Sequence, residues 1–463
     1  MRLFTAELIY VNGVFRRDYA VLVDGEGRIQ KVVHRSELIH DKEETAHDLH
    51  NLDRCALLPG CVNSHSHAFQ VYLRGAADQA AGFDDWVDRY LYPLALALDE
   101  EAIYASAQLA FYQMMLAGTT TVGEFFYLAN DRDGRPAENA GARAVIRAAR
   151  DVGLRIVLLR SFYDQGAKSG QRRFREKAQD ARRLTEMLAS EFAHDSGVSV
   201  LPAPHSLHGA SREAIQAAAE LAASWNAPFH IHLAERRSDI DRARDLHGCR
   251  PLEALDRMGV LSARTVVVHG CWLAAEERAR LAETSAGLVV SPVTNQYLGD
   301  GVTDVADLLS RGVHVSLGTD ANVRSSLFGE ARAAEFLART GRLSMGVLSR
   351  ASRIPGPQAL LWMATEAGAR NLGVSAGVLA PGQWADMVAL DLTDPSLAGG
   401  ERGESAALVN RIVFSMVPES AVRHVFVGGV PVLYDREPVR VERKQVVEAA
   451  RAHLPSLGAT SIR

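Results

Sequence analysis

The stretch Leu57-Leu58-Pro59-Gly60-Cys61-Val62-Asn63-Ser64-His65-Ser66-His67 is an apolar run that ends in two histidines. In a β-strand, side chains two positions apart point to the same face. If this run is a strand, His65 and His67 can bind one metal ion together, and imidazole nitrogen suits zinc and similar divalent metals. A chance pair of loop histidines explains an isolated His-x-His equally well, so the rest of the chain must decide.

Seven further apolar runs follow, separated by segments rich in Ala, Leu, Glu and Arg that have helical periodicity. The eight runs cover residues 57–67, 119–125, 155–161, 198–206, 227–235, 265–270, 287–292 and 314–321. Strand and helix alternating eight times predict an α/β fold, a parallel (β/α)8 TIM-type barrel, with a doubly wound open sheet as the alternative. Barrel enzymes place their chemistry at the C-terminal ends of the strands.

Short strand patterns separated by tight turns, such as Asn12-Gly13 and Asp24-Gly25, occupy the N-terminal flank of this region. Similar patterns follow it, before a final helix at 443–453. We therefore predict a small composite β-sandwich built from residues 1–56 and 375–463, and a barrel over residues 57–374 that carries the metal site.

Composition excludes several classes of function. The net charge is −5 and the arginines form no basic stripe, so nucleic acid is not an expected partner. No apolar run of about 18 residues indicates a membrane span, and Glu7 interrupts the position of a secretion signal. The four cysteines form no C-x-x-C pair. We expect a cytoplasmic enzyme that acts on a small molecule and water.

Polar residues gather at the ends of five of the eight runs. Each one alone has a structural explanation, such as a buried hydrogen-bonded histidine or an aspartate that caps the next helix. Together, three histidines and one carboxylate can hold a metal and leave a coordination position for water, which is typical of a catalytic zinc site. The residues are His65, His67, His205, His230, His232, Glu235, His269 and Asp320.

The order His65-Ser66-His67, His232, His269, Asp320 resembles the amidohydrolase superfamily, and His232-Leu233-Ala234-Glu235 is similar to its mononuclear deaminase branch. The fourth run lacks the lysine that bridges two metals in binuclear members. The resemblance implies one Zn²⁺ per subunit, with Fe or Mn as alternatives, held by His65, His67, His232 and Asp320, and a homodimer. It also implies that Asp320 and His269 orient a water and take its proton, while Glu235 protonates the substrate nitrogen before ammonia leaves.

Several stretches resemble the formimidoylglutamate deiminase family, which implies N-formimidoyl-L-glutamate as substrate. They are His65-Ser66-His67-Ala68-Phe69-Gln70, Glu124-Phe125-Phe126-Tyr127 and Pro204-His205-Ser206-Leu207, and they imply substrate contacts from Gln70, Tyr127 and His205. Two departures concern carboxylate recognition, because Val87 after Trp86, and His208, stand where that family has arginines. We expect Trp86 and His208 to line the pocket, with Arg89 or Arg324 replacing the missing charge.

A second resemblance favours a different substrate class. Phe83-Asp84-Asp85-Trp86, Tyr92-Pro93-Leu94 and Asn322 are similar to the deaminases of adenosine-type thioethers and the triazine hydrolases. The alternative function is therefore a deaminase or chlorohydrolase of a heteroaromatic ring, of adenosine-thioether, pterin, pyrimidine or triazine type. A non-catalytic scaffold is a minor alternative, which the complete set of ligands disfavours.

Overall fold

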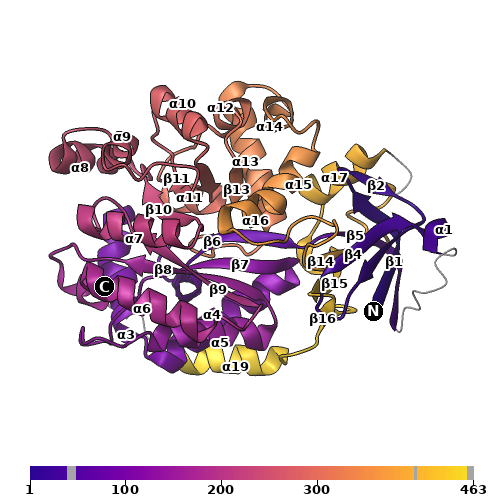
Figure 1. Cartoon of the computed structure of the whole chain (residues 1–463), viewed down its shortest axis with the longest axis horizontal. Coiled ribbons are helices and arrows are strands. Elements are labelled where there is room, and N and C mark those ends of the chain that lie inside the picture. Colours follow the sequence, from indigo (N-terminus) through magenta and orange to yellow (C-terminus); the bar gives the residue numbers. More distant parts are fainter. Residues whose placement is uncertain (39–47, 401–403, 456–463) are drawn as a thin grey trace.

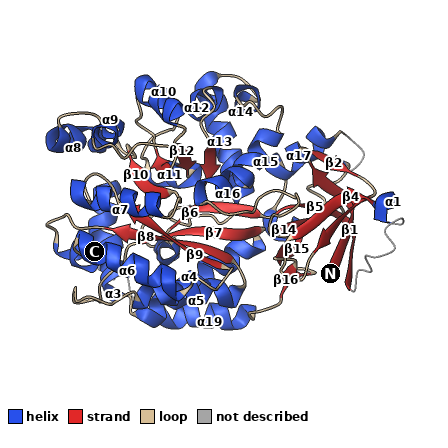
Figure 2. Cartoon of the chain, in the orientation of Figure 1, coloured by secondary structure: helices blue, strands red, loops and turns tan. Residues whose placement is uncertain are grey.

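The computed structural model describes residues 1–38, 48–400 and 404–455. A helix-ringed barrel occupies most of the molecule, and strands from both ends of the chain lie together at the right of Figure 1. Figure 2 shows the same separation, with long helices around the barrel and mostly strands at the other end. The predicted fold class, a (β/α)8 barrel with a composite β-sandwich, is confirmed.

The barrel consists of two hydrogen-bonded groups of four parallel strands. Single bridges between Ser66 and Asp320 and between Ser206 and His232 join the two groups into a ring. The strands are almost entirely buried, as expected when helices cover a parallel barrel. In ring order they are β6 (Cys61–Ser66), β7 (Thr119–Phe126), β8 (Arg155–Phe162), β9 (Val198–Pro204), β10 (Phe229–Leu233), β11 (Thr265–His269), β12 (Gly287–Val290) and β13 (Val315–Leu317).

Helices that pack on the barrel bury small or apolar faces, and several begin at a side-chain cap. Asp99 accepts a hydrogen bond from the Ala102 amide at the start of α4, and Ser211 caps α7 in the same way. None of the helices in the described part of the chain is both long and apolar enough to cross a bilayer. The longer helices are α4 (Glu100–Leu116), α5 (Ala140–Val152), α6 (Ala178–Glu191), α7 (Arg212–Ser224), α8 (Arg237–His247), α10 (Ala275–Thr284), α13 (Leu327–Arg342), α17 (Ser405–Phe414) and α19 (Arg443–His453).

Shorter helices fill the loops. They are α1 (Arg35–Leu38), η1 (Ala68–Leu73), α2 (Phe83–Trp86), η2 (Val87–Leu91), α3 (Tyr92–Ala97), η3 (Ser169–Arg173), α9 (Pro251–Arg257), α11 (Pro292–Leu298), α12 (Val305–Ser310), α14 (Val347–Ala351), α15 (Gln358–Ala364), α16 (Glu366–Leu372) and α18 (Pro418–Ala421). The segment from α2 to α3 follows the first barrel strand and forms one wall of the main pocket.

One sheet unites the two ends of the chain. Phe4 and Phe426 lie on strands separated by two others, yet their ring centroids are 5.1 Å apart. The sheet therefore folds over on itself and encloses a core of its own. Its order is β17 (Glu437–Pro438), β16 (Val430–Tyr434), β15 (Val422–Val427), β14 (Met387–Asp391), β5 (Asp48–Pro59), β1 (Arg2–Val11), β3 (Tyr19–Val23) and β4 (Ile29–His34), with β2 (Val14–Arg16) paired to β1.

The run 57–67, expected as a single barrel strand, is divided between the two sheets. Its first three residues end β5 in the sandwich, and the barrel strand begins at Cys61. Gly60 is the joint, because a Cβ there would lie 2.3 Å from the side chain of Thr120. Both strands are buried, so an uninterrupted apolar run cannot reveal the break. The predicted domain boundaries at 56/57 and 374/375 stay a prediction.

A buried ion pair connects the barrel to the sheet. Arg155 on β8 donates from Nε to Asp386 Oδ2 over 3.0 Å, and both side chains are nearly inaccessible. Asp386 also accepts the Gly428 amide at 2.7 Å, and the Arg155 guanidinium stacks 4.1 Å from the Trp384 ring. Removing one member of such a pair leaves the other charge buried without its partner.

We therefore predict that Arg155→Met lowers the free energy of unfolding by about 3–5 kcal/mol, as measured by urea denaturation. The matched control is Arg143→Met, which breaks the half-exposed pair with Glu191 and should cost less than about 1 kcal/mol. Equal effects of the two substitutions would contradict a structural role for the Arg155–Asp386 pair.

Candidate metal centre and active site

Three histidine nitrogens converge at the C-terminal end of the barrel. The Nε2 atom of His65 lies 3.3 Å from that of His67 and 3.1 Å from that of His232. Asp320 completes the group, with Oδ1 at 3.5 Å from His65 Nε2 and 3.4 Å from His67 Nε2. All four side chains are buried. The structure thus brings together the four residues that the sequence predicts as ligands.

Hydrogen bonds fix which nitrogen of each ring faces the centre. His67 Nδ1–H donates to the Phe125 carbonyl at 2.9 Å, and His232 Nδ1–H donates to the His205 carbonyl at 2.8 Å. A carbonyl only accepts, so both Nε2 atoms carry lone pairs that point into the group. His65 Nδ1 has no hydrogen-bond partner in the described chain, and its ring packs 5.3 Å from Phe125.

This arrangement fits a divalent metal. Burial lowers the pKa of His65 to about 4 and that of His67 to about 3, so both rings are neutral at pH 7. The lone pairs of neutral imidazoles and the carboxylate oxygen of Asp320 are all hydrogen-bond acceptors. Acceptors that lie this close together repel one another unless a cation lies between them. The three histidines form a cluster whose ligand atoms lie within 4.8 Å of each other, as in a mononuclear site with nitrogen and oxygen ligands.

Three residues of the site adopt left-handed backbone conformations. Ala234, His269 and Asp320 have φ values of 49°, 74° and 48°. Such conformations cost a non-glycine residue about 1–3 kcal/mol and persist only where neighbouring structure imposes them. Asp320 is held on both sides, since its amide donates to the His65 carbonyl and its carbonyl accepts the His67 amide.

Glu235 lies beside the metal ligands and faces His269. Its Oε1 atom is 3.6 Å from His269 Nε2, and its side chain is 14% exposed. Burial, helped by the nearby charge of Asp239, raises the pKa of Glu235 to about 8. The carboxyl group therefore carries a proton at neutral pH and can donate it to a substrate in the pocket.

A residue that the sequence did not single out supports His269 from behind. The Asn295 side-chain nitrogen donates to Asp300 Oδ2 and lies 3.2 Å from His269 Nδ1. Both Asn295 and Asp300 are buried. Asn295 lies on α11 and Asp300 just beyond that helix, and no motif distinguishes Asn295 from an ordinary helical residue.

A cavity of about 360 Å³ opens onto the ligand group, which is large enough for a small organic molecule. Of the expected substrate contacts, Gln70, Trp86, Tyr127, His205 and His208 line it. The Gln70 amide donates to the Tyr127 hydroxyl at 2.9 Å. Aromatic rings that can stack on a planar substrate form much of the wall, from Phe83, Trp86, Tyr92, Tyr127, Tyr163 and Phe174.

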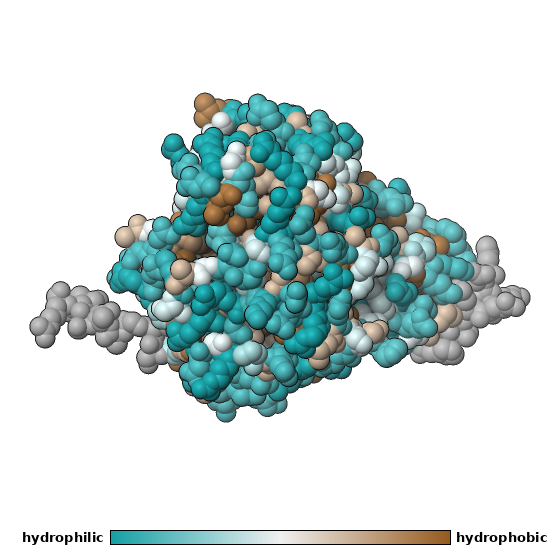
Figure 3. All heavy atoms as spheres, turned by 60° about the vertical axis from the view of Figure 1, so that its left-hand side comes forward, coloured by the Kyte–Doolittle hydropathy of each residue, from teal (hydrophilic) through white to brown (hydrophobic). Residues whose placement is uncertain are grey.

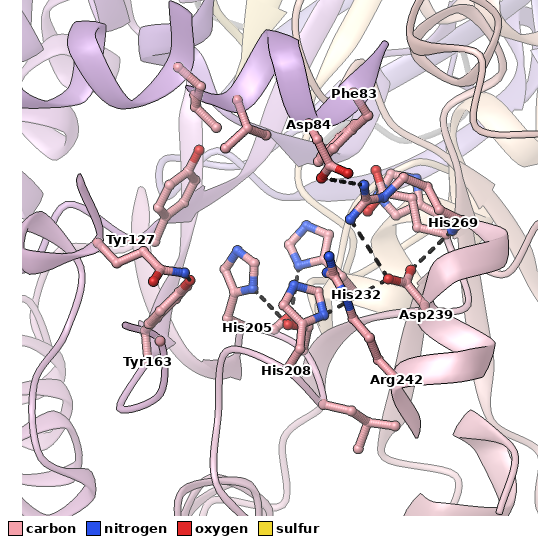
Figure 4. A pocket seen from close by; sticks show the side chains of 18 of the residues that line it. Phe83, Asp84, Tyr127, Tyr163, His205, His208, His232, Asp239, Arg242 and His269 are labelled. Atoms are coloured by element: carbon pink, nitrogen blue, oxygen red, sulfur yellow. Dashed lines mark hydrogen bonds and ion pairs between the residues drawn. The ribbon is translucent and has the colours of Figure 1, made fainter. Parts of the chain in front are cut away.

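The outer part of the pocket is charged (Figure 4). Arg236 stacks 3.6 Å from the Phe83 ring and approaches Asp84 at 3.5 Å and Asp239 at 3.8 Å. Lys168 and Arg242 also line this region. The end of the molecule that carries α8 is turned forward in Figure 3, where hydrophilic residues cover most of the surface and hydrophobic ones are scattered in small groups.

Two arginines expected near the substrate lie elsewhere. Arg324 lines a neighbouring cavity with Arg74 and Tyr297, not the cavity at the ligand group. Arg89 is 55% exposed and pairs with Asp85. The sequence missed Arg242, because α8 carries three arginines and its sequence gives no signal for which one faces a pocket.

His230 lies deeper in the barrel than His232, on the same strand. Its Nε2 atom is 2.8 Å from the Asn371 carbonyl, and the side chain is fully buried. It therefore packs within the barrel, as the sequence indicated, and stays outside the ligand cluster.

Comparison with known proteins identifies the family. A model of the amidohydrolase family matches residues 56–432. The chain is 32% identical to a 5'-deoxyadenosine deaminase of Methanothermobacter thermautotrophicus, over 86% of each chain. It is 29% identical to a 5-methylthioadenosine/S-adenosylhomocysteine deaminase of Haloquadratum walsbyi, over 87% of this chain and 85% of the other. The chain belongs to the amidohydrolase family.

A solved structure gives the same result for the whole fold. The amidohydrolase of Brucella melitensis superposes with a TM-score of 0.87 at 26% identity and covers 99% of this chain and 100% of its own. The prediction of a metal-dependent enzyme of this family is confirmed. The specific resemblance to formimidoylglutamate deiminases receives no support, because the relatives named above act on adenosine-type compounds.

The lowered pKa values of the ligand histidines predict how metal binding depends on pH. A lowered pKa keeps each ring neutral, and able to bind metal, until the pH approaches 4. The zinc affinity should therefore change little between pH 7 and pH 5.5 when measured by competition with a chelator. Ordinary histidines would weaken zinc binding roughly tenfold per ligand over that range, and a loss of that size would contradict the prediction.

Proposed function

We propose that this protein is a mononuclear zinc enzyme that hydrolytically deaminates an adenosine-type nucleoside and releases ammonia. The observation that carries the proposal is the position of Glu235. The Glu235 carboxyl group is protonated at neutral pH. It lies near the cluster of three histidines and lines the aromatic pocket. With this arrangement, Glu235 can protonate a ring nitrogen of the substrate. That nitrogen is bonded to the carbon from which the amine is lost.

Two observations support the adenosine-type substrate over N-formimidoyl-L-glutamate. The relatives reported above are deaminases of 5'-deoxyadenosine or of methylthioadenosine and S-adenosylhomocysteine. Rings also line much of the pocket, and planar heteroaromatic ligands gain from stacking on them. The heteroaromatic alternative therefore replaces the acyclic amidine as the first proposal.

The residues divide the chemistry among them. His65, His67, His232 and Asp320 would hold the metal, which when bound activates a water as the nucleophile. Asp320 and His269 would orient that water and take its proton, and His269 Nε2 lies 3.6 Å from Glu235 Oε1. Glu235 gives its proton to the adjacent ring nitrogen, which makes the carbon more electrophilic.

Collapse of the tetrahedral carbon then expels ammonia. The leaving nitrogen must gain a proton, and the group that took one from water is available to supply it. Gln70 and Tyr127, joined by a hydrogen bond, lie on the wall beside His67 and can orient the ring edge. The His205 ring also lines the cavity, with its centroid 5.0 Å from that of His232.

The first test is ammonia release by the zinc-loaded protein. We expect turnover of 5'-deoxyadenosine or 5'-methylthioadenosine and none of N-formimidoyl-L-glutamate. Ammonia from N-formimidoyl-L-glutamate alone would overturn the substrate class, and no ammonia from any of the three, with zinc bound, would overturn the proposed function.

The role of Glu235 has a separate test. Glu235→Gln should retain zinc but lose about 10²-fold or more in kcat, because the amide cannot donate the transferred proton and regain it. Glu213→Gln, at an exposed position in the first turn of α7, is the matched control and should leave kcat unchanged. Near-normal kcat in Glu235→Gln would exclude Glu235 as the proton donor.

A further inference from the structure

Three basic side chains line the outer pocket, and they differ in their partners. Lys168 pairs with Asp88, with Nζ at 2.8 Å from Oδ1. Arg236 stacks on Phe83 and pairs with two carboxylates. Arg242 lines the same pocket, and within the described residues it has no hydrogen bond, ion pair or cation–π contact.

Arg242 lies on α8 and is partly buried. In Figure 4 its side chain extends from the helix toward His208. Its charge acts on the rings of His208, Tyr163 and Tyr92. Burial keeps the pKa of His208 below its usual value, and tyrosines are neutral at pH 7, so none of these neighbours balances the guanidinium.

The two carboxylates of the outer pocket, Asp84 and Asp239, lie against Arg236 and not against Arg242. Asp239 accepts the backbone amide of Arg236 at 3.0 Å and lies 3.8 Å from the Arg236 guanidinium. Asp84 pairs with the same arginine and is 74% exposed, so solvent screens its charge. A guanidinium that faces a ligand cavity without a protein counter-ion is suited to bind a carboxylate in bidentate fashion.

We propose that Arg242 forms a subsite for a carboxylate of the substrate, at the outer end of the pocket and away from the reacting amine. Aromatic rings connect this subsite to the metal ligands, with centroid separations of 6.0 Å from His208 to His205 and 5.0 Å from His205 to His232. A substrate that reaches from the metal to Arg242 therefore combines a ring with an extended side chain.

This inference rests on the proposed function and narrows its substrate class. S-adenosylhomocysteine and 5'-methylthioadenosine share the adenosine and thioether groups, but only the former carries an amino-acid chain with a carboxylate. The subsite predicts a preference for S-adenosylhomocysteine over 5'-methylthioadenosine, which comes from binding rather than from the chemical step, because Arg242 does not touch the reacting atoms.

The test compares the two substrates on zinc-loaded wild-type protein and Arg242→Met. The substitution should raise KM for S-adenosylhomocysteine about ten- to hundredfold, the effect of losing a charged hydrogen-bond pair. It should leave kcat, and both parameters for 5'-methylthioadenosine, within about threefold. Arg242→Lys should restore part of the loss, since it keeps the charge but not the fork of donors.

Arg244→Met is the matched control. Arg244 lies on the same helix, is 58% exposed and pairs weakly with Asp241. Arg244→Met should change neither KM nor kcat for either substrate. If Arg242→Met raised KM equally for both substrates, or for neither, the proposed subsite would be overturned.

A binding measurement separates this inference from the proposed function. Calorimetric titration of zinc-loaded Glu235→Gln protein with each compound needs no turnover. Tighter binding of S-adenosylhomocysteine that Arg242→Met abolishes would support the subsite even if wild-type protein released no ammonia. Equal affinity for the two compounds, or no binding of either, would overturn it.

Discussion

The hydrogen bonds that close the barrel also set the positions of the metal ligands. The His67 amide donates to the Asp320 carbonyl at 2.8 Å, and the Asp320 amide donates to the His65 carbonyl at 3.0 Å. These bonds join β6 to β13 across the closing bridge between Ser66 and Asp320. The spacing of three ligands is thus fixed by the backbone of the closed ring, and any loosening of the ring would separate them.

The sequence predicts the ring and its ligands because both follow from simple periodicities. Buried parallel strands are apolar runs, and polar residues at their C-terminal ends must meet at one end of a barrel. The break at Gly60 is invisible for the same reason, since strands buried in two different sheets have the same composition. Arg324 and Arg242 could not be ranked from sequence, because the direction of a loop or of a helix face is decided by tertiary packing.

Substrate choice depends on a different part of the pocket from the chemical step. Metal ligands, an acid and a water suffice to hydrolyse many C–N bonds, so they discriminate little among planar substrates. The outer wall can discriminate strongly, because a buried or partly buried charge without a partner penalises a substrate that fails to satisfy it. In this pocket the aromatic wall favours a ring, and the unpaired charge on α8 favours an anion.

The network around Arg236 links these two functions. Arg236 directly follows Glu235, and a salt bridge between them would lower the pKa of Glu235 and remove the proton it must donate. Its guanidinium instead lies on the Phe83 ring, 3.6 Å from the centroid, and turns to Asp84 and Asp239. Burial and the negative charge of Asp239 raise the pKa of Glu235, whereas the charge of Arg236 lowers it, so the turn of Arg236 away from Glu235 leaves the acid its proton. Because Arg236 lies against the acidic side chains of the rim, Arg242 keeps its charge unpaired.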